Sequence, residues 1–154
     1  MDAIIRPEEP AQGVIELALV GMGSASGDRS EHPVLDHAVL SRLADRLGGR
    51  GSASRYLALV LVHGPGTLHQ LGAAVDQADV VDLRIQMAVL QDRVRVLGLA
   101  RLTATCMAAE RELGPGGAFA HDPVGSGALR WWGRAVTDEL AIGLARLSND
   151  RSLL

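Results

Sequence analysis

The sequence contains no lysine, so all 15 of its basic residues are arginines. Without lysine, the chain has no residue for a lysine-based phosphate clamp or for a Schiff base with a carbonyl substrate. Cys106 is the only cysteine, which excludes an intrachain disulfide and a cysteine-based zinc site and favours a reducing, cytoplasmic environment. The sequence shows no evident histidine partner that could activate the Cys106 thiol, so we expect Cys106 to be a core residue rather than a nucleophile.

The sequence also lacks a basic stripe and a long apolar run. Its formal net charge is −3, which argues against a nucleic-acid-binding protein. The longest apolar run, residues 56–62, is too short to cross a bilayer, and the acidic, proline-containing N-terminus is unlike a signal peptide. We therefore expect a soluble cytoplasmic protein that binds neither nucleic acid nor membrane.

The length and composition fit one domain with a real core, because 47% of the 154 residues are hydrophobic. Residues 1–12 are predicted to be a flexible lead-in, and residues 13–154 a single α/β domain. Residues 14–24 and 56–62 are apolar runs that end at glycines, which is typical of buried parallel strands. Residues 34–49 between them have helical spacing, so the order is β-α-β.

The rest of the chain is predicted to continue a mostly parallel sheet sandwiched by helices. A long helix is expected over residues 76–97, and a short strand and the start of a helix after it. The glycine- and proline-rich residues 112–127 are expected to form a mobile loop or a β-hairpin. Residues 128–154 are expected to form strands and turns. There, the adjacent Trp131 and Trp132 would face opposite sides of a strand, and an exposed tryptophan would be a candidate interface anchor.

The segment HGPGT, residues 63–67, is the main candidate site. If a helix begins after it, free backbone amides and the positive end of the helix dipole would converge at Gly64, Gly66 and Thr67. Gly23 and Ser24 end the first predicted strand, and parallel strands bring their carboxyl ends to one edge of the sheet, where ligands bind. An anion pocket and a simple tight turn both fit this pattern. His69 is favoured as an additional ligand contact.

The other histidines are predicted to have no ligand role. His63 is interpreted as structural. The remaining three have no metal-ligand spacing with one another and are interpreted as solvated surface residues, so no metal site is expected. They are His32, His37 and His121.

The order of the predicted elements resembles the first, acceptor lobe of the amino acid kinase superfamily, closest to its isopentenyl phosphate kinase and fosfomycin kinase branch. The segments GMGS, VHGPG and WWGRAVTDELAIGLARLSNDRSLL carry the resemblance, with Gly133, Asp138, Ser148 and Asp150 in matching places. The resemblance implies a phosphotransferase that uses ATP and magnesium on a small phosphate or phosphonate. Asp138 and Asp150 would be its catalytic candidates, and another chain would supply the nucleotide lobe.

Departures from the family pattern affect the residues that matter most for phosphoryl transfer. Val20 replaces the family's lysine, Met22 replaces a glycine, and Arg134 replaces an aspartate. Pro65 replaces the middle glycine of HGPGT and removes one N–H donor. Loss of the lysine removes the main electrostatic stabilisation of the transferring group. These departures favour a non-catalytic, kinase-derived binding or assembly subunit that oligomerises, retains an anion pocket and uses no cofactor. In such a subunit, Asp138 and Asp150 would only cap turns. The phosphotransferase remains the alternative.

The helix predicted over residues 76–97 has two apolar faces. The second, narrower one contains Ile85, Val89 and Val96. A chain this short has little to cover both faces, and the resembled family pairs subunits through this region. We therefore expect a homo-oligomer, or a hetero-oligomer with a full-length paralogue, through the main apolar face. That face consists of Val80, Leu83, Met87, Leu90, Val94 and Leu97.

Overall fold

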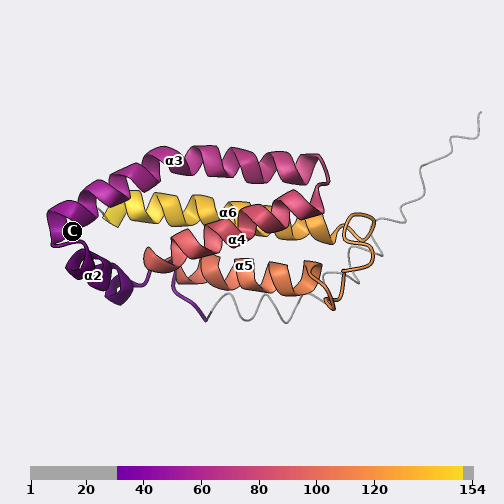
Figure 1. Cartoon of the computed structure of the whole chain (residues 1–154), viewed down its shortest axis with the longest axis horizontal. Coiled ribbons are helices and arrows are strands. Elements are labelled where there is room, and N and C mark those ends of the chain that lie inside the picture. The colour runs from indigo at the N-terminus through magenta and orange to yellow at the C-terminus, as the bar shows by residue number, and fades with distance from the viewer. Residues whose placement is uncertain (1–30, 151–154) are drawn as a thin grey trace, which may run out of the picture.

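The computed structural model describes residues 31–150, and these form a bundle of five α-helices (Figure 1). Residues 31–150 contain no strand, so the prediction of an α/β fold with a parallel sheet is wrong. The amino acid kinase fold that the resemblance implied is wrong for the same reason. The predicted first strand, residues 14–24, lies outside the described residues. The helices are α2 (His37–Arg46), α3 (Arg50–Asp76), α4 (Val80–Val96), α5 (Ala100–Leu113) and α6 (Ala128–Asn149).

Helix α3 passes through both the predicted strand at residues 56–62 and the predicted turn HGPGT. One face of this helix is buried against the bundle. Leu57, Gly64 and Leu71 lie on that face because they are seven residues, or two helical turns, apart, and their burial stabilises the helix. Pro65 within α3 removes one helical hydrogen bond, the one that its missing N–H would donate to the carbonyl of Leu61. Figure 1 shows α3 bending along the bundle, as helices with an internal proline do.

Helix α6 packs against both α3 and α5 and forms much of the core. Its buried residues recur three and four apart, so the strands predicted for this segment are wrong. Trp132 is fully buried, and its ring meets that of Trp131 edge to face with centroids 4.6 Å apart. Gly133 of α6 lies against Val75 of α3, where a Cβ atom would collide with the valine side chain. Close approach of α3 and α6 therefore depends on glycine.

Helices α2 and α4 agree with the sequence predictions. Helix α2 begins after Asp36, whose Oδ1 accepts hydrogen bonds from the backbone N–H groups of Ala38 at 2.9 Å and Val39 at 3.3 Å. Helix α4 begins after Asp79, whose Oδ1 accepts from the N–H of Asp82 at 2.9 Å. The helices predicted over residues 34–49 and 76–97 are thus confirmed, with their ends shortened by a few residues.

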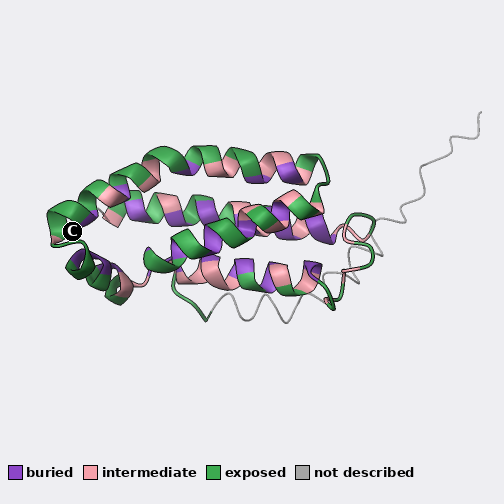
Figure 2. Cartoon of the chain, in the orientation of Figure 1, coloured by how far each residue is buried: buried purple, intermediate pink, exposed green. Residues whose placement is uncertain are grey.

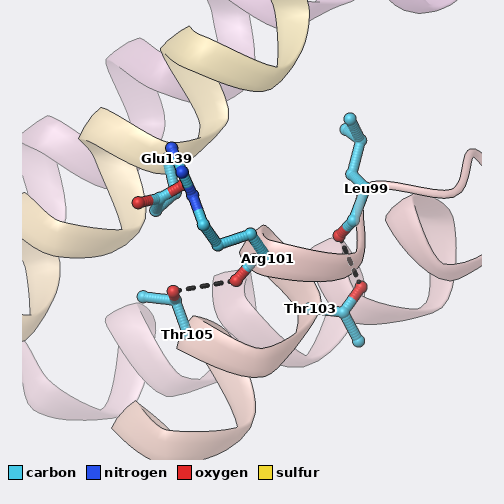
Figure 3. A network of polar contacts seen from close by, with 5 residues as sticks. All are labelled: Leu99, Arg101, Thr103, Thr105 and Glu139. Atoms are coloured by element: carbon cyan, nitrogen blue, oxygen red, sulfur yellow. Dashed lines mark hydrogen bonds and ion pairs between the residues drawn. The ribbon is translucent and has the colours of Figure 1, made fainter. Parts of the chain in front are cut away.

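Helix α5 contains Cys106, which is fully buried, so the predicted core role of this residue is confirmed. An ion pair links α5 to α6, with Arg101 Nε 2.7 Å from Glu139 Oε2 (Figure 3). In the same region, the Thr105 hydroxyl donates to the Arg101 carbonyl at 2.9 Å. Residues 112–127 were expected to form a mobile loop or a β-hairpin; residues 112 and 113 belong to α5, and residues 114–127 form turns and bends without a strand, so the β-hairpin is wrong.

Candidate functional site

A groove with a volume of about 560 Å³ lies between α3 and the C-terminal half of α4, with α6 beneath it. The two helices are joined by a short turn, Gln77 to Asp79, and Figure 1 shows α4 diverging from α3 as it leaves that turn. Leu140 and Leu144 of α6 line the groove together with residues of α3 and α4. The apolar floor and sides consist of Leu59, Val60, Leu90, Val94, Leu97, Leu99, Leu140 and Leu144.

Two glycines of α3 shape the groove in different ways. A Cβ atom at Gly64 would lie 2.5 Å from Leu144 Cδ1, so any larger residue here would require the Leu144 side chain to move. A Cβ atom at Gly66 would have no heavy atom within 4 Å, so this residue leaves open space above the floor. Gly64 therefore serves the packing of α3 on α6, and Gly66 keeps the groove open.

Polar side chains line the edge of this apolar groove. Tyr56, His63, Thr67 and Gln70 come from α3, and Arg93 comes from α4. Arg93 is exposed and forms no ion pair with another described residue. A guanidinium beside an apolar surface suits a ligand that carries an acidic group on an apolar body, because an arginine binds a carboxylate or phosphate with two parallel hydrogen bonds.

The residues predicted at HGPGT line this groove, but they do not form a cradle at a helix N-terminus. Gly64, Gly66 and Thr67 lie in the middle of α3, so the amides there belong to the helix instead of converging at its start. The Thr67 hydroxyl is 3.5 Å from the carbonyl of His63. His69 is exposed on α3 and is not part of the groove lining. A role of the three HGPGT residues in ligand binding stays a prediction.

The remaining predicted site residues are not brought together. Gly23 and Ser24 lie outside the described residues. Asp138 is exposed on α6, and Asp150 follows the end of that helix with its Oδ2 2.8 Å from Arg146 Nε. The two aspartates are 12 residues apart, which corresponds to about 18 Å along a helix. Within residues 31–150, no group of three or more His, Cys, Asp or Glu side chains could hold a metal ion.

The oligomer face predicted on α4 is buried inside the protein's own bundle. Five of its six side chains, those of Leu83, Met87, Leu90, Val94 and Leu97, are at most 4% exposed. Val80 is partly buried against the same core. Whether the chain forms an oligomer stays a prediction, and a partner would have to contact other residues.

Sequence reasoning missed Tyr56, Gln70 and Arg93 as groove residues. Tyr56, His63, Thr67 and Gln70 are seven, four and three residues apart, which is the spacing of one helical face. The signal was therefore present, but it becomes visible only when residues 50–76 are read as a single helix. Arg93 gave no signal, because its position depends on how α4 diverges from α3.

Comparison with known proteins places the chain in no family. No family model matches it, and no match was found among curated proteins or solved structures. In the described part of the chain, no helix combines the length and the apolar character that crossing a membrane requires.

Proposed function

We propose that this chain is a binding protein that holds a small, elongated amphipathic molecule in the groove between α3, α4 and α6. The apolar body of the ligand lies on the leucine-rich floor, and an acidic head group meets Arg93 at the edge. The observation that carries the proposal is the combination of an apolar groove of about 560 Å³ with a single arginine among its lining residues. Small-molecule sites have this character and span roughly 300–1,000 Å³.

The apolar floor supplies most of the binding free energy in this proposal. A ligand that buries about 200 Å² of its apolar surface there gains about 5 kcal/mol before the cost of association. The open upper side of the groove leaves part of the ligand in water, so affinities in the micromolar range are expected rather than very tight binding.

Arg93 supplies selectivity for an acidic head group. Hydrogen bonds to charged groups contribute about 1.5–3 kcal/mol when shielded from water, and less at an exposed edge. We therefore expect loss of the guanidinium to weaken binding of an anionic ligand about tenfold, which corresponds to about 1.4 kcal/mol. Binding of an uncharged ligand of the same shape should change little.

The experiment is a fluorescence titration of the full chain with anilinonaphthalene sulfonate, an apolar ring system with one anionic group. Arg93→Ala is compared with Arg95→Ala, since Arg95 is also exposed on α4 but lies outside the groove. A roughly tenfold increase in Kd for Arg93→Ala and an unchanged Kd for Arg95→Ala support the proposal. Equal Kd values for the two variants and the wild type would contradict it.

A second variant tests the apolar floor independently of charge. Gly66→Leu places a side chain in the open space above the floor without meeting another atom at its Cβ. Binding of the same probe should then be lost, while the helical circular dichroism spectrum stays that of the wild type. Retained binding by a folded Gly66→Leu protein would place the probe elsewhere.

This proposal keeps the binding role expected from the sequence and changes its structural basis. The phosphotransferase alternative loses its support, because Asp138 and Asp150 do not line the groove with the HGPGT residues and are 12 residues apart on and after α6. A cytoplasmic location remains part of the proposal, based on a single cysteine that is buried in the core.

A further inference from the structure

We propose that the outer face of α3 pairs with the same face of a second copy of this chain, with the two helices antiparallel. This outer face consists of six residues that recur alternately four and three apart, as in the contact seam of two packed helices. They are Arg55, Leu59, Val62, Gly66, His69 and Ala73, of which Leu59 and Gly66 also line the groove where it borders this face.

The outer face of α3 is apolar although it is exposed. Leu59 is 58% exposed and Val62 is 71% exposed, and Figure 2 shows that most of the outer side of α3 is exposed. Residues 56–75 contain no Asp, Glu, Lys or Arg. A helix with one side in water normally has charged residues on that side, so the absence of charge after Arg55, over residues 56–75, indicates a contact surface.

The few charges of α3 indicate what the partner is. Arg50 and Arg55 lie in its first two turns, and Asp76 is its last residue. Each of these charges opposes the helix macrodipole, because cations are unfavourable near the N-terminus and anions near the C-terminus. None of the three forms an ion pair with another described residue.

An antiparallel second copy reverses both unfavourable placements. With the two-fold axis near residue 64, position 55 lies opposite position 73 of the other copy, one helical turn from Asp76 of that copy. Arg55 then approaches the carboxylate and the negative end of the partner helix. The same pairing occurs twice because of the symmetry.

Side-chain size is also self-complementary in this arrangement. Position 62 lies opposite position 66, so Val62 of each copy packs over Gly66 of the other. Leu59 lies opposite His69 in the same way. A large side chain thus meets a small one at the centre of the contact, which allows the two helices to approach closely.

A second exposed apolar stripe, on α4, is the competing surface. Val81, Ile85 and Val89 are 67%, 55% and 44% exposed. Charged residues are interspersed in this part of α4, at Asp82 and Arg84. The charges at its ends, Asp82 in the first turn and Arg93 and Arg95 in the last, already suit the dipole of their own helix, so an antiparallel copy relieves no unfavourable placement there. The stripe on α4 therefore provides a matched control.

The first test measures the mass of the full chain by sedimentation equilibrium over a range of concentrations. We expect twice the mass of one chain for the wild type and for Ile85→Glu, and the mass of one chain for Val62→Glu. Because both altered residues are exposed, both variants should keep the helical spectrum of the wild type. A monomer at all concentrations would overturn the proposal, as would a dimer that Ile85→Glu disrupts and Val62→Glu leaves intact.

The second test is a charge exchange that only an antiparallel pairing can rescue. Arg55 and Asp76 of one chain are 21 residues apart, about 32 Å along the helix, so they cannot contact each other within a chain. Arg55→Asp and Asp76→Arg alone should each raise the dimer dissociation constant severalfold, and the double variant should restore the wild-type value. Weakening by both single variants without rescue would exclude the antiparallel arrangement.

Discussion

Gly64 and Gly66 are two residues apart on α3, and the structure predicts opposite effects of the same substitution on stability. Replacing a glycine inside a helix by alanine stabilises the helix by about 0.5–1 kcal/mol. At Gly66 nothing opposes this gain, since a Cβ atom there has no heavy atom within 4 Å. At Gly64 the new methyl group would lie 2.5 Å from Leu144 Cδ1, and overpacking of this kind costs about 1–3 kcal/mol.

We therefore expect Gly66→Ala to raise the free energy of unfolding by about 0.5–1 kcal/mol and Gly64→Ala to leave it unchanged or lower it by up to about 2 kcal/mol. The assay is equilibrium urea unfolding followed by helical circular dichroism, with all proteins diluted until they are monomeric, because Gly66 also lies in the proposed contact between two copies. Equal changes for the two variants, or a loss of more than about 1 kcal/mol for Gly66→Ala, would refute a continuous α3 packed on α6. A strand-to-helix turn at HGPGT would give such a result, since both glycines would then be needed for the turn.

The remaining predictions concern single side chains and use the same unfolding assay. Pro65→Ala restores the missing helical N–H donor at an exposed position, so it should stabilise the protein by about 1–3 kcal/mol. Destabilisation by this substitution would mean that the bend of α3 is required for packing. Burial, reinforced by the nearby Glu110, raises the pKa of Cys106 from 9.0 to about 12. The unfolded thiol ionises at lower pH than the folded one, so the free energy of unfolding should fall above pH 9 by about 1.4 kcal/mol per pH unit, and the Cys106→Ala variant should lack this contribution. A double-mutant cycle of Arg101→Ala and Glu139→Ala should give a coupling free energy between the two side chains of about 1 kcal/mol. This coupling free energy should decrease in high salt, because the ion pair is only partly buried. A coupling free energy of zero would show that the ion pair does not hold α5 against α6.

The helices that sequence analysis predicted correctly are those in which a main apolar face recurs with helical spacing. Asp36 and Asp79 each precede a run in which apolar residues recur three and four apart, and both helices begin directly after these aspartates. Periodicity is a local property, so it could be recognised without knowledge of the packing, whereas the two capping aspartates were not used and the predicted starts were a few residues early.

Helix α3 was mistaken for a strand because its exposed side is as apolar as its buried side. Leu59 and Val62 fill the positions where a helix of this kind usually has charged residues, which turns the helical pattern into a continuous apolar run. Gly64 and Pro65 then suggested a turn. The feature that misled the prediction, an apolar exposed side, is the one that now indicates a contact surface.

The groove could be predicted only in part. The α3 residues that line it follow from helical spacing once α3 is known to be a helix. Its floor, formed by Leu140 and Leu144 of α6, depends on contacts between segments about 80 residues apart in the sequence. Periodicity within a single segment contains no information on such contacts, so the combination of groove and Arg93 required the structure.

The most direct test of the central claim, that the groove is a ligand site, is to locate the bound probe by methyl NMR of the leucine-labelled protein. Titration with anilinonaphthalene sulfonate should shift the methyl signals of Leu59, Leu140 and Leu144, which line the groove. The signals of Leu113 and Leu129, which are buried outside the groove, should not move. Shifts confined to Leu113 and Leu129, or no leucine shift at saturating probe, would contradict the account.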